Sequence, residues 1–331
     1  MKKLLTVLMA MMMVTALAGC GQTTTEAEAT TAVTTVAVTE VTTEAETAIE
    51  TTEAPVVENN YPMTLTDKYG NEIVIEEQPQ SIISMSPELT EILYALGAAD
   101  KMIGRSSYCN FPAETADVQD FGTLFDLNIE SIVAAAPDVV FLSSMASEEL
   151  VNSLLDNELT VIAVDKDSNL QGTYEHFALV GSVIGEEEAA EALTMEVQAQ
   201  IAAVEEKVAG LEAPTVYYSV YAGDGYDSTA TGDTFIHDMI VTAGGNNIAK
   251  EGEFWSYSVE TLVEQNPYMM FCGDAEGTKS RIQGLEGYKE LTAVIEDRLY
   301  EVNADIFSRQ GPRIGEAIEV LARFIHPEAF Q

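Results

Sequence analysis

Short apolar runs alternate along this chain with segments whose apolar residues recur every three or four positions. Residues 63–75 form two alternating runs around Tyr69-Gly70-Asn71, which predicts a β-hairpin. Beyond it the pattern predicts strand 81–85, helix 87–96, strand 102–104, helix 129–136, strand 138–142, helix 147–157 and strand 160–164. This alternating order is typical of a parallel sheet covered by helices.

The segment 168–210 has no strand pattern. Its apolar residues keep helical spacing through 174–184 and 186–208, which predicts one long helix or two helices broken at Gly185. Beyond Pro214 the alternation resumes, with strands predicted at 215–221, 268–272 and 299–302 and helices at 234–243, 258–265, 288–295 and 312–325. The predicted fold is therefore α/β, with two lobes joined by a long rigid helix and a ligand cleft between them.

The first twenty residues have the layout of a bacterial lipoprotein signal. Met1-Lys2-Lys3 precedes an apolar run, 4–18, that is too short to span a bilayer permanently, and Leu17-Ala18-Gly19-Cys20 closes it. Cleavage before Cys20 would leave a thiol for lipidation, and more than one acyl chain gives lasting attachment. An ordinary secretory signal followed by an incidental cysteine is the alternative.

Residues 21–60 consist almost entirely of Thr, Glu, Ala and Val, with eight glutamates, no Lys or Arg and no aromatic residue. Such a segment cannot bury enough apolar surface to offset the entropy of ordering it, so we expect a disordered tether. A strand at 33–41, where Thr and Val alternate, is the alternative. The predicted organisation is a signal peptide at 1–19, lipidated cysteine and tether at 20–60, a first lobe at 61–166, the interlobe helix at 167–212 and a second lobe at 213–331.

The folded part of the chain is strongly acidic. The 331 residues include 55 acidic and 15 basic ones, a formal charge of −40, and only eight of the acids lie in the tether. Such a surface repels nucleic acid and anionic lipid, which argues against both as partners, and weakly favours cationic ligands. Beyond Cys20 only Cys109 and Cys272 remain, too few for a disulfide framework, so we expect free or buried thiols.

No sequence motif points to catalysis. The chain lacks a Gly-x-Ser-x-Gly elbow, a glycine-rich phosphate loop and a His-Glu-x-x-His helix. His176, His237 and His326 fall in three different elements, and we expect structural roles for them rather than metal ligation or base catalysis. The sequence therefore predicts no enzyme activity, no resident metal and no cofactor.

Aromatic residues gather in loops at the ends of predicted strands, where binding residues are more common than in the strands themselves. The set comprises Tyr108, Phe111, Phe121 and Phe125 in the first lobe and Tyr221, Tyr226, Phe254, Trp255 and Tyr257 in the second. We expect Phe111 and Phe121 to plug their loops onto the lobe. The others would suit a flat or bulky apolar ligand.

Six blocks follow one another through the two lobes, at 84–97, 104–112, 127–140, 232–248, 258–267 and 309–314. Together they resemble the cobalamin and iron-siderophore substrate-binding proteins of ABC importers, over most of the chain from Pro62 to Pro327. The resemblance implies two lobes on a rigid helical backbone, as in class III periplasmic binding proteins. It also implies a protein that delivers a metal chelate to a permease with small lobe motion.

By this resemblance Tyr108 and Trp255 take the places of cleft aromatic residues, and Asp305 and Arg309 those of polar cleft residues. The full set predicted to contact ligand is Ser86, Pro87, Tyr108, Phe125, Tyr221, Trp255, Asp305 and Arg309. Ile306 and the pair Ser143-Ser144 stand where cobalamin binders tend to carry tryptophan. That departure leaves a ferric siderophore or heme open beside a corrinoid.

Two acids are assigned a different role by the resemblance. Glu91 and Glu260 match glutamates that in this family meet arginines of the permease, and we expect both to be exposed at the lobe tips, outside the cleft. Solvated helix carboxylates without a partner are the alternative.

The sequence thus predicts a monomeric, lipid-anchored protein on the outer face of the cell membrane. It would bind a ferric siderophore or a cobalamin-type corrinoid and pass it to an ABC permease with its ATPase. Heme is the alternative ligand. An extracellular enzyme using the same cleft, and a scavenger or adhesin without a permease, are the rival functions.

Overall fold

The structure is a computed structural model that describes residues 60–165, 168–223 and 226–331. The predicted signal peptide, Cys20 and nearly all of the predicted tether lie outside the described residues. Within the described ranges, no helix is both long enough and apolar enough to cross a membrane.

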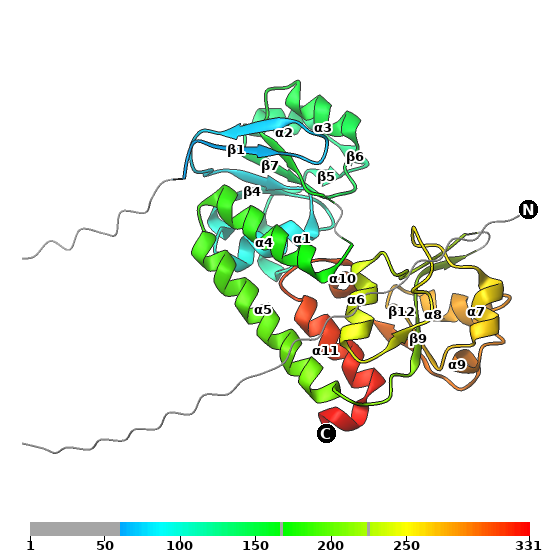
Figure 1. Ribbon diagram of the computed structural model, residues 1–331. Coiled ribbons are helices and arrows are strands. Elements are labelled where there is room, and N and C mark those ends of the chain that lie inside the picture. The colour runs from blue at the N-terminus through cyan, green and yellow to red at the C-terminus, as the bar shows by residue number, and fades with distance from the viewer. Residues whose placement is uncertain (1–59, 166–167, 224–225) are drawn as a thin grey trace, which may run out of the picture. The chain divides into compact units, whose positions relative to one another are not determined.

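The first lobe, which we call lobe 1, contains a parallel sheet and its covering helices (Figure 1). Its elements are β1 (Met63–Thr66), β2 (Glu72–Ile75), β3 (Ile82–Ser84), α1 (Pro87–Ala95), η1 (Ala99–Lys101), β4 (Met102–Arg105), η2 (Ala113–Asp117), β5 (Gly122–Thr123), β6 (Asp126–Leu127), α2 (Ile129–Ala135), β7 (Val139–Leu142), α3 (Glu148–Leu155) and β8 (Val161–Ala163). The sheet has the order β4-β3-β7-β8, and all its pairings are parallel. The alternating pattern thus predicted this sheet correctly.

Local sequence accounts for the start of lobe 1. The β1–β2 hairpin is antiparallel, and the Asp67 carboxylate holds its turn by accepting hydrogen bonds from the backbone N–H groups of Tyr69 and Asn71. Helix α1 begins after Ser86, whose hydroxyl accepts from the Leu89 N–H, and has proline at its first position. The hairpin and this helix are confirmed as predicted.

The second lobe, lobe 2, repeats the same plan with additions. Its elements are β9 (Thr215–Gly223), β10 (Tyr226–Thr229), α6 (Phe235–Thr242), β11 (Asn246–Asn247), α7 (Val259–Gln265), β12 (Met269–Gly273), α8 (Thr278–Gly284), α9 (Thr292–Ile295), β13 (Leu299–Val302), α10 (Ala304–Ser308), α11 (Ile314–Ile325) and η3 (Pro327–Phe330). Strands β9, β12 and β13 are parallel, β10 pairs with β9 as an antiparallel neighbour, and β11 adds a short parallel bridge to β9.

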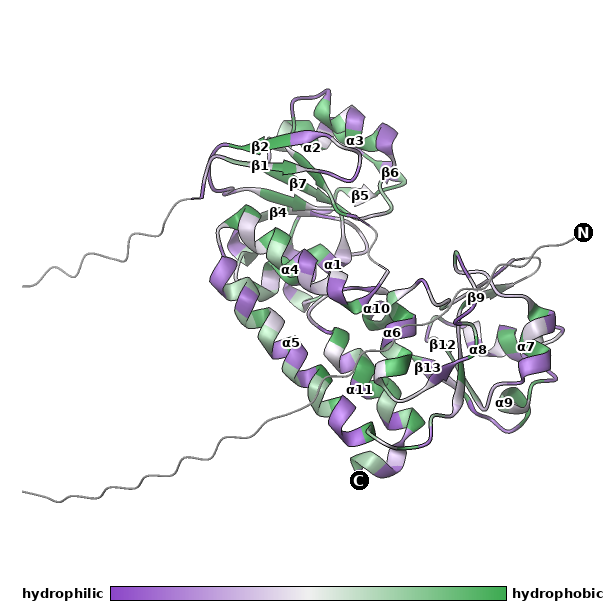
Figure 2. Ribbon diagram, in the orientation of Figure 1, coloured by the Kyte–Doolittle hydropathy of each residue, from purple (hydrophilic) through white to green (hydrophobic). Residues whose placement is uncertain are grey.

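Two helices, rather than one, join the lobes. They are α4 (Leu170–Ile184) and α5 (Glu187–Val208), and Gly185 between them adopts φ 72°, a left-handed conformation that ends α4. Helix α4 packs against α1 of lobe 1, and α5 packs against α4 and against α6 and α11 of lobe 2. Hydrophilic and hydrophobic residues alternate along α5, as expected of a helix with one buried face (Figure 2).

A continuous buried apolar cluster runs through both lobes and the linking helices. It includes Leu89 and Ile92 of lobe 1, Val180 and Ile201 of the linking helices, and Met239 of lobe 2. Close packing of this kind resists large relative movements. The described residues accordingly form one compact unit.

One predicted helix is partly wrong. The segment 288–295 is helical only in α9, because Leu291 has an extended backbone (φ −66°, ψ 137°) and serves as its N-cap. The short elements β5, β6, β10, β11, α8 and α10 were not predicted.

Candidate functional site

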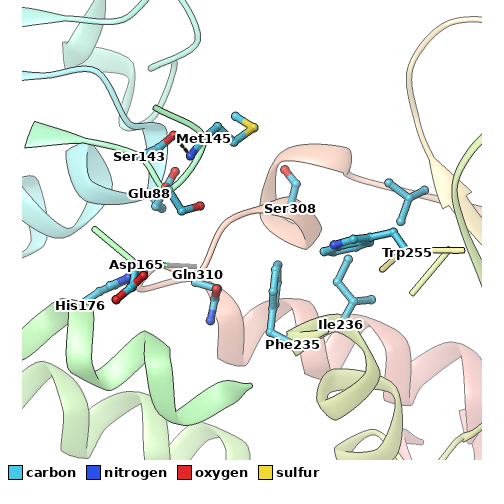
Figure 3. Close-up of a pocket in the computed structure, with 12 residues that line it drawn as sticks. Glu88, Ser143, Met145, Asp165, His176, Phe235, Ile236, Trp255, Ser308 and Gln310 are labelled. Atoms are coloured by element: carbon cyan, nitrogen blue, oxygen red, sulfur yellow. Dashed lines mark hydrogen bonds between the residues drawn. The ribbon is translucent and has the colours of Figure 1, made fainter. Parts of the chain in front are cut away.

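A cavity of about 450 Å³ opens between the lobes and is lined by residues of both (Figure 3). Its lining consists of Glu88, Ser143, Ser144, Met145 and Asp165 of lobe 1, His176 of α4, and Val220, Phe235, Ile236, Trp255, Ser308 and Gln310 of lobe 2. The volume falls in the range of about 300 to 1,000 Å³ that is usual for small-molecule sites.

The lobe 1 wall is made at the carboxyl ends of three neighbouring parallel strands. Glu88 lies in the first turn of α1 after β3, Ser143 directly follows β7, and Asp165 follows β8. Ligands of α/β sheets usually bind at these strand ends. The strand order of lobe 1 therefore brings polar side chains from distant parts of the sequence to one wall.

The lobe 2 wall is mainly apolar. Phe235 and Ile236 begin α6, Val220 belongs to β9, and the indole of Trp255 lies near Phe235 and Ile236 in Figure 3. Gln310 lies between the two walls, and its amide donates a hydrogen bond of 3.0 Å to the Asn169 carbonyl at the start of α4.

The turn that presents Trp255 has an unusual backbone. Phe254 and Trp255 are consecutive non-glycine residues with φ 54° and 62°, a conformation that costs about 1 to 3 kcal/mol each. The Phe254 N–H donates to Asp233 Oδ2 (3.0 Å) and the Trp255 N–H to Thr231 Oγ1 (3.2 Å), while the Trp255 carbonyl accepts from Thr229 N–H. These bonds hold the backbone of the turn that carries the indole at the cavity wall.

A buried ion cluster joins the lobes beside the cavity. Glu91 Oε1 of α1 accepts from Arg309 Nη1 (2.8 Å) and Arg313 Nη2 (2.6 Å), and its Oε2 accepts from Arg313 Nε (2.8 Å). Arg309 also pairs with Asp305 (2.9 Å) and donates to Asn110 Oδ1 (2.8 Å). We call these five residues the interlobe ion cluster.

This cluster corrects the predicted role of Glu91. The Glu91 side chain is only 2% exposed and is enclosed by the two arginines of lobe 2, so it cannot be an exposed carboxylate at a lobe tip. Asp305 and Arg309, predicted to contact ligand, likewise belong to the cluster, and neither is among the residues that line the cavity. Glu260 is exposed at the start of α7, as predicted.

Of the other residues predicted to contact ligand, Trp255 lines the cavity and the rest are not among its lining residues. Ser86 is buried as the cap of α1, and Pro87 comes one residue before Glu88. Tyr108 and Phe125 are 58% and 77% exposed on lobe 1 loops and are not part of the lining.

Tyr221 does not line the cavity, although its neighbour in the strand, Val220, does. Successive side chains of a strand point to opposite faces, so Val220 of β9 lines the cavity while Tyr221 packs against Tyr226 and under the Arg281 guanidinium. Phe121 is buried against lobe 1, as predicted for a loop plug, whereas Phe111 is 43% exposed beneath the Arg313 guanidinium.

Both described cysteines and two of the three histidines lie outside the cavity lining. Cys109 and Cys272 are free and buried, and burial raises the pKa of the Cys109 thiol, which accepts a hydrogen bond from Thr90, and that of Cys272 to about 11. His237 lies 3.2 Å from the Asn247 amide, and His326 lies 3.1 Å from the Gly244 carbonyl. His176, by contrast, is part of the cavity wall.

Sequence reasoning missed Glu130, an acidic residue of lobe 1 whose position corresponds to that of Glu260 in lobe 2. Glu130 lies in α2 at the position that Glu260 has in α7: each helix follows a side-chain cap, ends in a left-handed residue (Ala136, Asn266) and leads through proline into a parallel strand. Glu130 is exposed. The correspondence between Glu130 and Glu260 can be found in the sequence, because residues 128–140 and 258–270 share the same spacing of cap, glutamate, apolar residues, proline and strand.

Across the described ranges, no group of three or more His, Cys, Asp and Glu side chains comes together as a metal site. The cavity itself combines two carboxylates, an imidazole, hydroxyls and an aromatic wall. Such a lining can bind a ligand that has an apolar face and polar groups along its edge.

Comparisons with known proteins agree on one family. A family model described as periplasmic binding protein matches residues 82–306. The substrate-binding lipoprotein YvrC of an ABC transporter of Bacillus subtilis is 29% identical over 278 residues, covering 82% of this chain and 88% of its own. A cobalamin-binding protein of Halobacterium salinarum is 27% identical over 280 residues, covering 81% and 75%.

Solved structures show the same fold. The periplasmic heme-binding protein RhuT of Roseiflexus superposes with a TM-score of 0.69 at 22% identity, covering 76% of this chain and 99% of its own. The α/β fold of two lobes is therefore the fold of periplasmic binding proteins, as predicted.

Proposed function

Because this chain belongs to the periplasmic binding protein family, we propose that it binds a metal chelate in the interlobe cavity and delivers it to an ABC importer. The observation that carries the proposal is the cavity, which has the strand ends of lobe 1 on one side and Trp255 on the other. Relatives named as substrate-binding and cobalamin-binding proteins support the same class of function.

The ligand we propose is a ferric siderophore or a corrinoid. A large chelate would lie with an apolar face on Phe235 and Trp255 and with its polar edge toward Glu88 and Asp165. The metal would enter as part of the ligand and not as a resident cofactor. Heme is a second candidate, but the heme-binding likeness at 22% identity supports the fold alone.

We propose binding without catalysis. The buried Cys109 thiol has a raised pKa and accepts a hydrogen bond from Thr90, which leaves it poorly suited to act as a nucleophile. The interlobe ion cluster and the continuous core favour a small movement of the lobes on binding.

The single tryptophan of the chain allows a direct test. Titration with a true chelate should quench Trp255 fluorescence, because the indole lies on the cavity wall and corrinoids, ferric siderophores and heme absorb light. Trp255→Ala should weaken binding, followed by the visible absorption of the ligand, by about 1 to 3 kcal/mol. Tyr108→Ala, on an exposed loop outside the lining, is the matched control. Wild-type affinity in Trp255→Ala would exclude this cavity as the site.

We further propose that Cys20 anchors the protein, as a monomer, to the outer face of the membrane. The relative YvrC carries the name lipoprotein, and the sequence around Cys20 has the layout of a lipoprotein signal. Cys20→Ala should move the protein from the membrane to the soluble fraction or leave it as precursor, measured by fractionation and blotting. Unchanged retention of a processed Cys20→Ala protein would contradict the anchor.

We propose that Glu130 and Glu260 dock to the permease. Glu130 takes the role that was predicted for Glu91, and Glu260 keeps its predicted role. Both are exposed, and they hold equivalent positions in the two lobes. Hydrogen bonds from its own backbone N–H and from the Ser258 hydroxyl lower the pKa of Glu260. A permease with two matching arginines would meet one carboxylate on each lobe.

A further inference from the structure

Two hairpin turns hold equivalent positions in the two lobes. The β5–β6 hairpin of lobe 1 turns at Leu124-Phe125, and an isolated antiparallel bridge of lobe 2 encloses Phe254-Trp255. The stretches 122–130 and 252–260 share the spacing of glycine, turn, helix cap and glutamate. Trp255 therefore corresponds to Phe125.

The two turns differ in backbone conformation. Phe254 and Trp255 have φ 54° and 62°, and the Ser256 N–H donates to the Glu253 carbonyl across them (3.0 Å). Positive φ at both central residues is the pattern of a type I′ turn, in which Asn and Gly are the usual residues. In the described ranges, neither central residue of the lobe 1 turn has a positive φ. A hairpin at this position of a lobe can therefore form without a left-handed turn.

The left-handed turn coincides with a different placement of its aromatic side chain. Trp255 lines the cavity near Phe235 (Figure 3), whereas Phe125 is 77% exposed and is not part of the lining. Left-handed backbone is costly for bulky L-residues, so contacts outside the lobe 2 turn are needed to hold it.

Two side chains supply such contacts. The Phe254 N–H donates to Asp233 Oδ2 (3.0 Å), and the Trp255 N–H donates to Thr231 Oγ1 (3.2 Å). The Thr231 hydroxyl in turn donates to Asp233 Oδ1. A carboxylate suits position 233, because it accepts on both oxygens, whereas an amide side chain accepts on one only.

These two residues are attached to the apolar wall of the cavity. Thr231 is 0% exposed, and its carbonyl accepts from the hydroxyl (2.8 Å) and the N–H (3.1 Å) of Thr234, the cap of α6. Helix α6 begins with the wall residues Phe235 and Ile236. The base of the turn also packs closely here, since a Cβ on Gly252 would lie 2.7 Å from Thr231 Cγ2.

We propose that Thr231 and Asp233 are positioning residues, which hold the turn at Phe254-Trp255 in its left-handed conformation and so place the indole before ligand arrives. The inference rests on the proposed function and adds a cause of its affinity. Neither residue is among those that line the cavity, so both would act through Trp255. An indole that is already in place does not have to be ordered on binding, which favours tighter binding.

The first test removes one hydroxyl from the full-length protein. Thr231→Val keeps the shape of the buried side chain but can neither accept from Trp255 nor donate to Asp233. In the free protein the fluorescence anisotropy of Trp255, the single tryptophan of the chain, should fall and its quenching by acrylamide should rise. If Thr231→Val does not fold, Asp233→Asn removes one acceptor at a half-buried position and should lower the anisotropy in the same way.

Affinity is measured by the visible absorption of four chelates: cyanocobalamin, ferrioxamine B, a ferric tris-catecholate and hemin. For the chelate that the wild-type protein binds, Thr231→Val should weaken binding about fivefold or more, the factor that corresponds to the cost of one left-handed residue. Thr90→Val is the matched control. Thr90 is also 0% exposed, and its hydroxyl also contacts two side chains, Ser84 Oγ (2.9 Å) and Cys109 Sγ (3.1 Å), but it lies in α1 of lobe 1. Its replacement should leave anisotropy and affinity unchanged.

Two double variants distinguish a positioning role from a general loss of structure. With Trp255→Ala already present, Thr231→Val should change the affinity by less than about twofold, because its effect passes through the indole. With Thr231→Val present, Phe254→Asn should restore the anisotropy toward the wild-type value, because asparagine is favoured at the first central position of a type I′ turn. Phe254 is 80% exposed, so this replacement removes little packing.

The outcomes separate the two proposals. Wild-type anisotropy and affinity in Thr231→Val would overturn the positioning role, and so would equal losses in Thr90→Val or a fivefold loss that persists with Trp255→Ala. Each of these results would leave the proposed function standing. If the wild-type protein bound none of the four chelates, the proposed function would fail, whereas the anisotropy of free Thr231→Val would still decide whether the turn is held in this way.

Discussion

Replacing Glu91 with alanine should lower the free energy of unfolding by about 3 to 5 kcal/mol, because two arginines would lose the carboxylate that pairs with them. The Glu91, Arg309 and Arg313 side chains are 2%, 7% and 19% exposed, so solvent cannot replace the lost partner. Urea denaturation followed by circular dichroism measures the change.

A surface pair provides the matched control for this prediction. Glu319 and Arg323 form an ion pair within α11 with side chains 39% and 52% exposed, and Glu319→Ala should cost no more than about 0.5 kcal/mol. If Glu91→Ala fails to fold, Glu91→Leu with Arg309→Met and Arg313→Met should fold, because replacing a whole buried cluster by apolar residues is often tolerated. Equal losses for Glu91→Ala and Glu319→Ala would show that the cluster does not stabilise the join between the lobes.

The contacts within the interlobe ion cluster could not be predicted from the sequence. Glu91 stands in a helical pattern that is compatible with an exposed carboxylate. Its partners Arg309 and Arg313 lie 218 and 222 positions further along the chain, and only the packing of α1 against the loop before α11 brings them together. Periodicity describes the face of a helix, and it carries no information on which distant residue covers that face.

The fold was predicted more completely than the site, for a physical reason. Strands and helices with buried apolar faces leave a regular period, and the caps Ser86 and Gly185 mark where such helices begin or end. Cavity residues leave no period, because they come from the ends of several strands. Trp255, which was predicted from its loop and from the family resemblance, lines the cavity.

Two of the predicted ligand contacts lie one or two residues away from the cavity lining for the same reason. Ser86 and Tyr221 were predicted, whereas Glu88 and Val220 line the cavity. A strand turns each successive side chain to the opposite face, so a site residue is fixed only when the register of β9 is known. The internal repeat that relates Glu130 to Glu260 could have been found from sequence, since it depends on spacing alone.

Changing Glu130 and Glu260 together to lysine should abolish uptake of labelled chelate by cells, because it would set like charges against the proposed permease arginines, at a cost of several kcal/mol. Chelate affinity of the purified double variant should stay within about twofold of wild type, since both residues lie outside the cavity lining.

The control for this prediction carries the same change in charge. Glu77→Lys with Glu276→Lys alters one exposed glutamate in each lobe away from α2 and α7, so steering by net charge alone should affect both double variants equally.

Loss of uptake only in the Glu130 and Glu260 variant would identify a specific contact on each lobe. Equal uptake by the two variants would rule out docking through these glutamates, and weakened chelate binding in the Glu130 and Glu260 variant would mean that one of them acts on the ligand site. Helices α2 and α7 each follow a side-chain cap and lead through a proline into a sheet strand, so the two glutamates hold equivalent positions on the two lobes. Single substitutions should therefore each reduce uptake partially, and the double substitution should remove it.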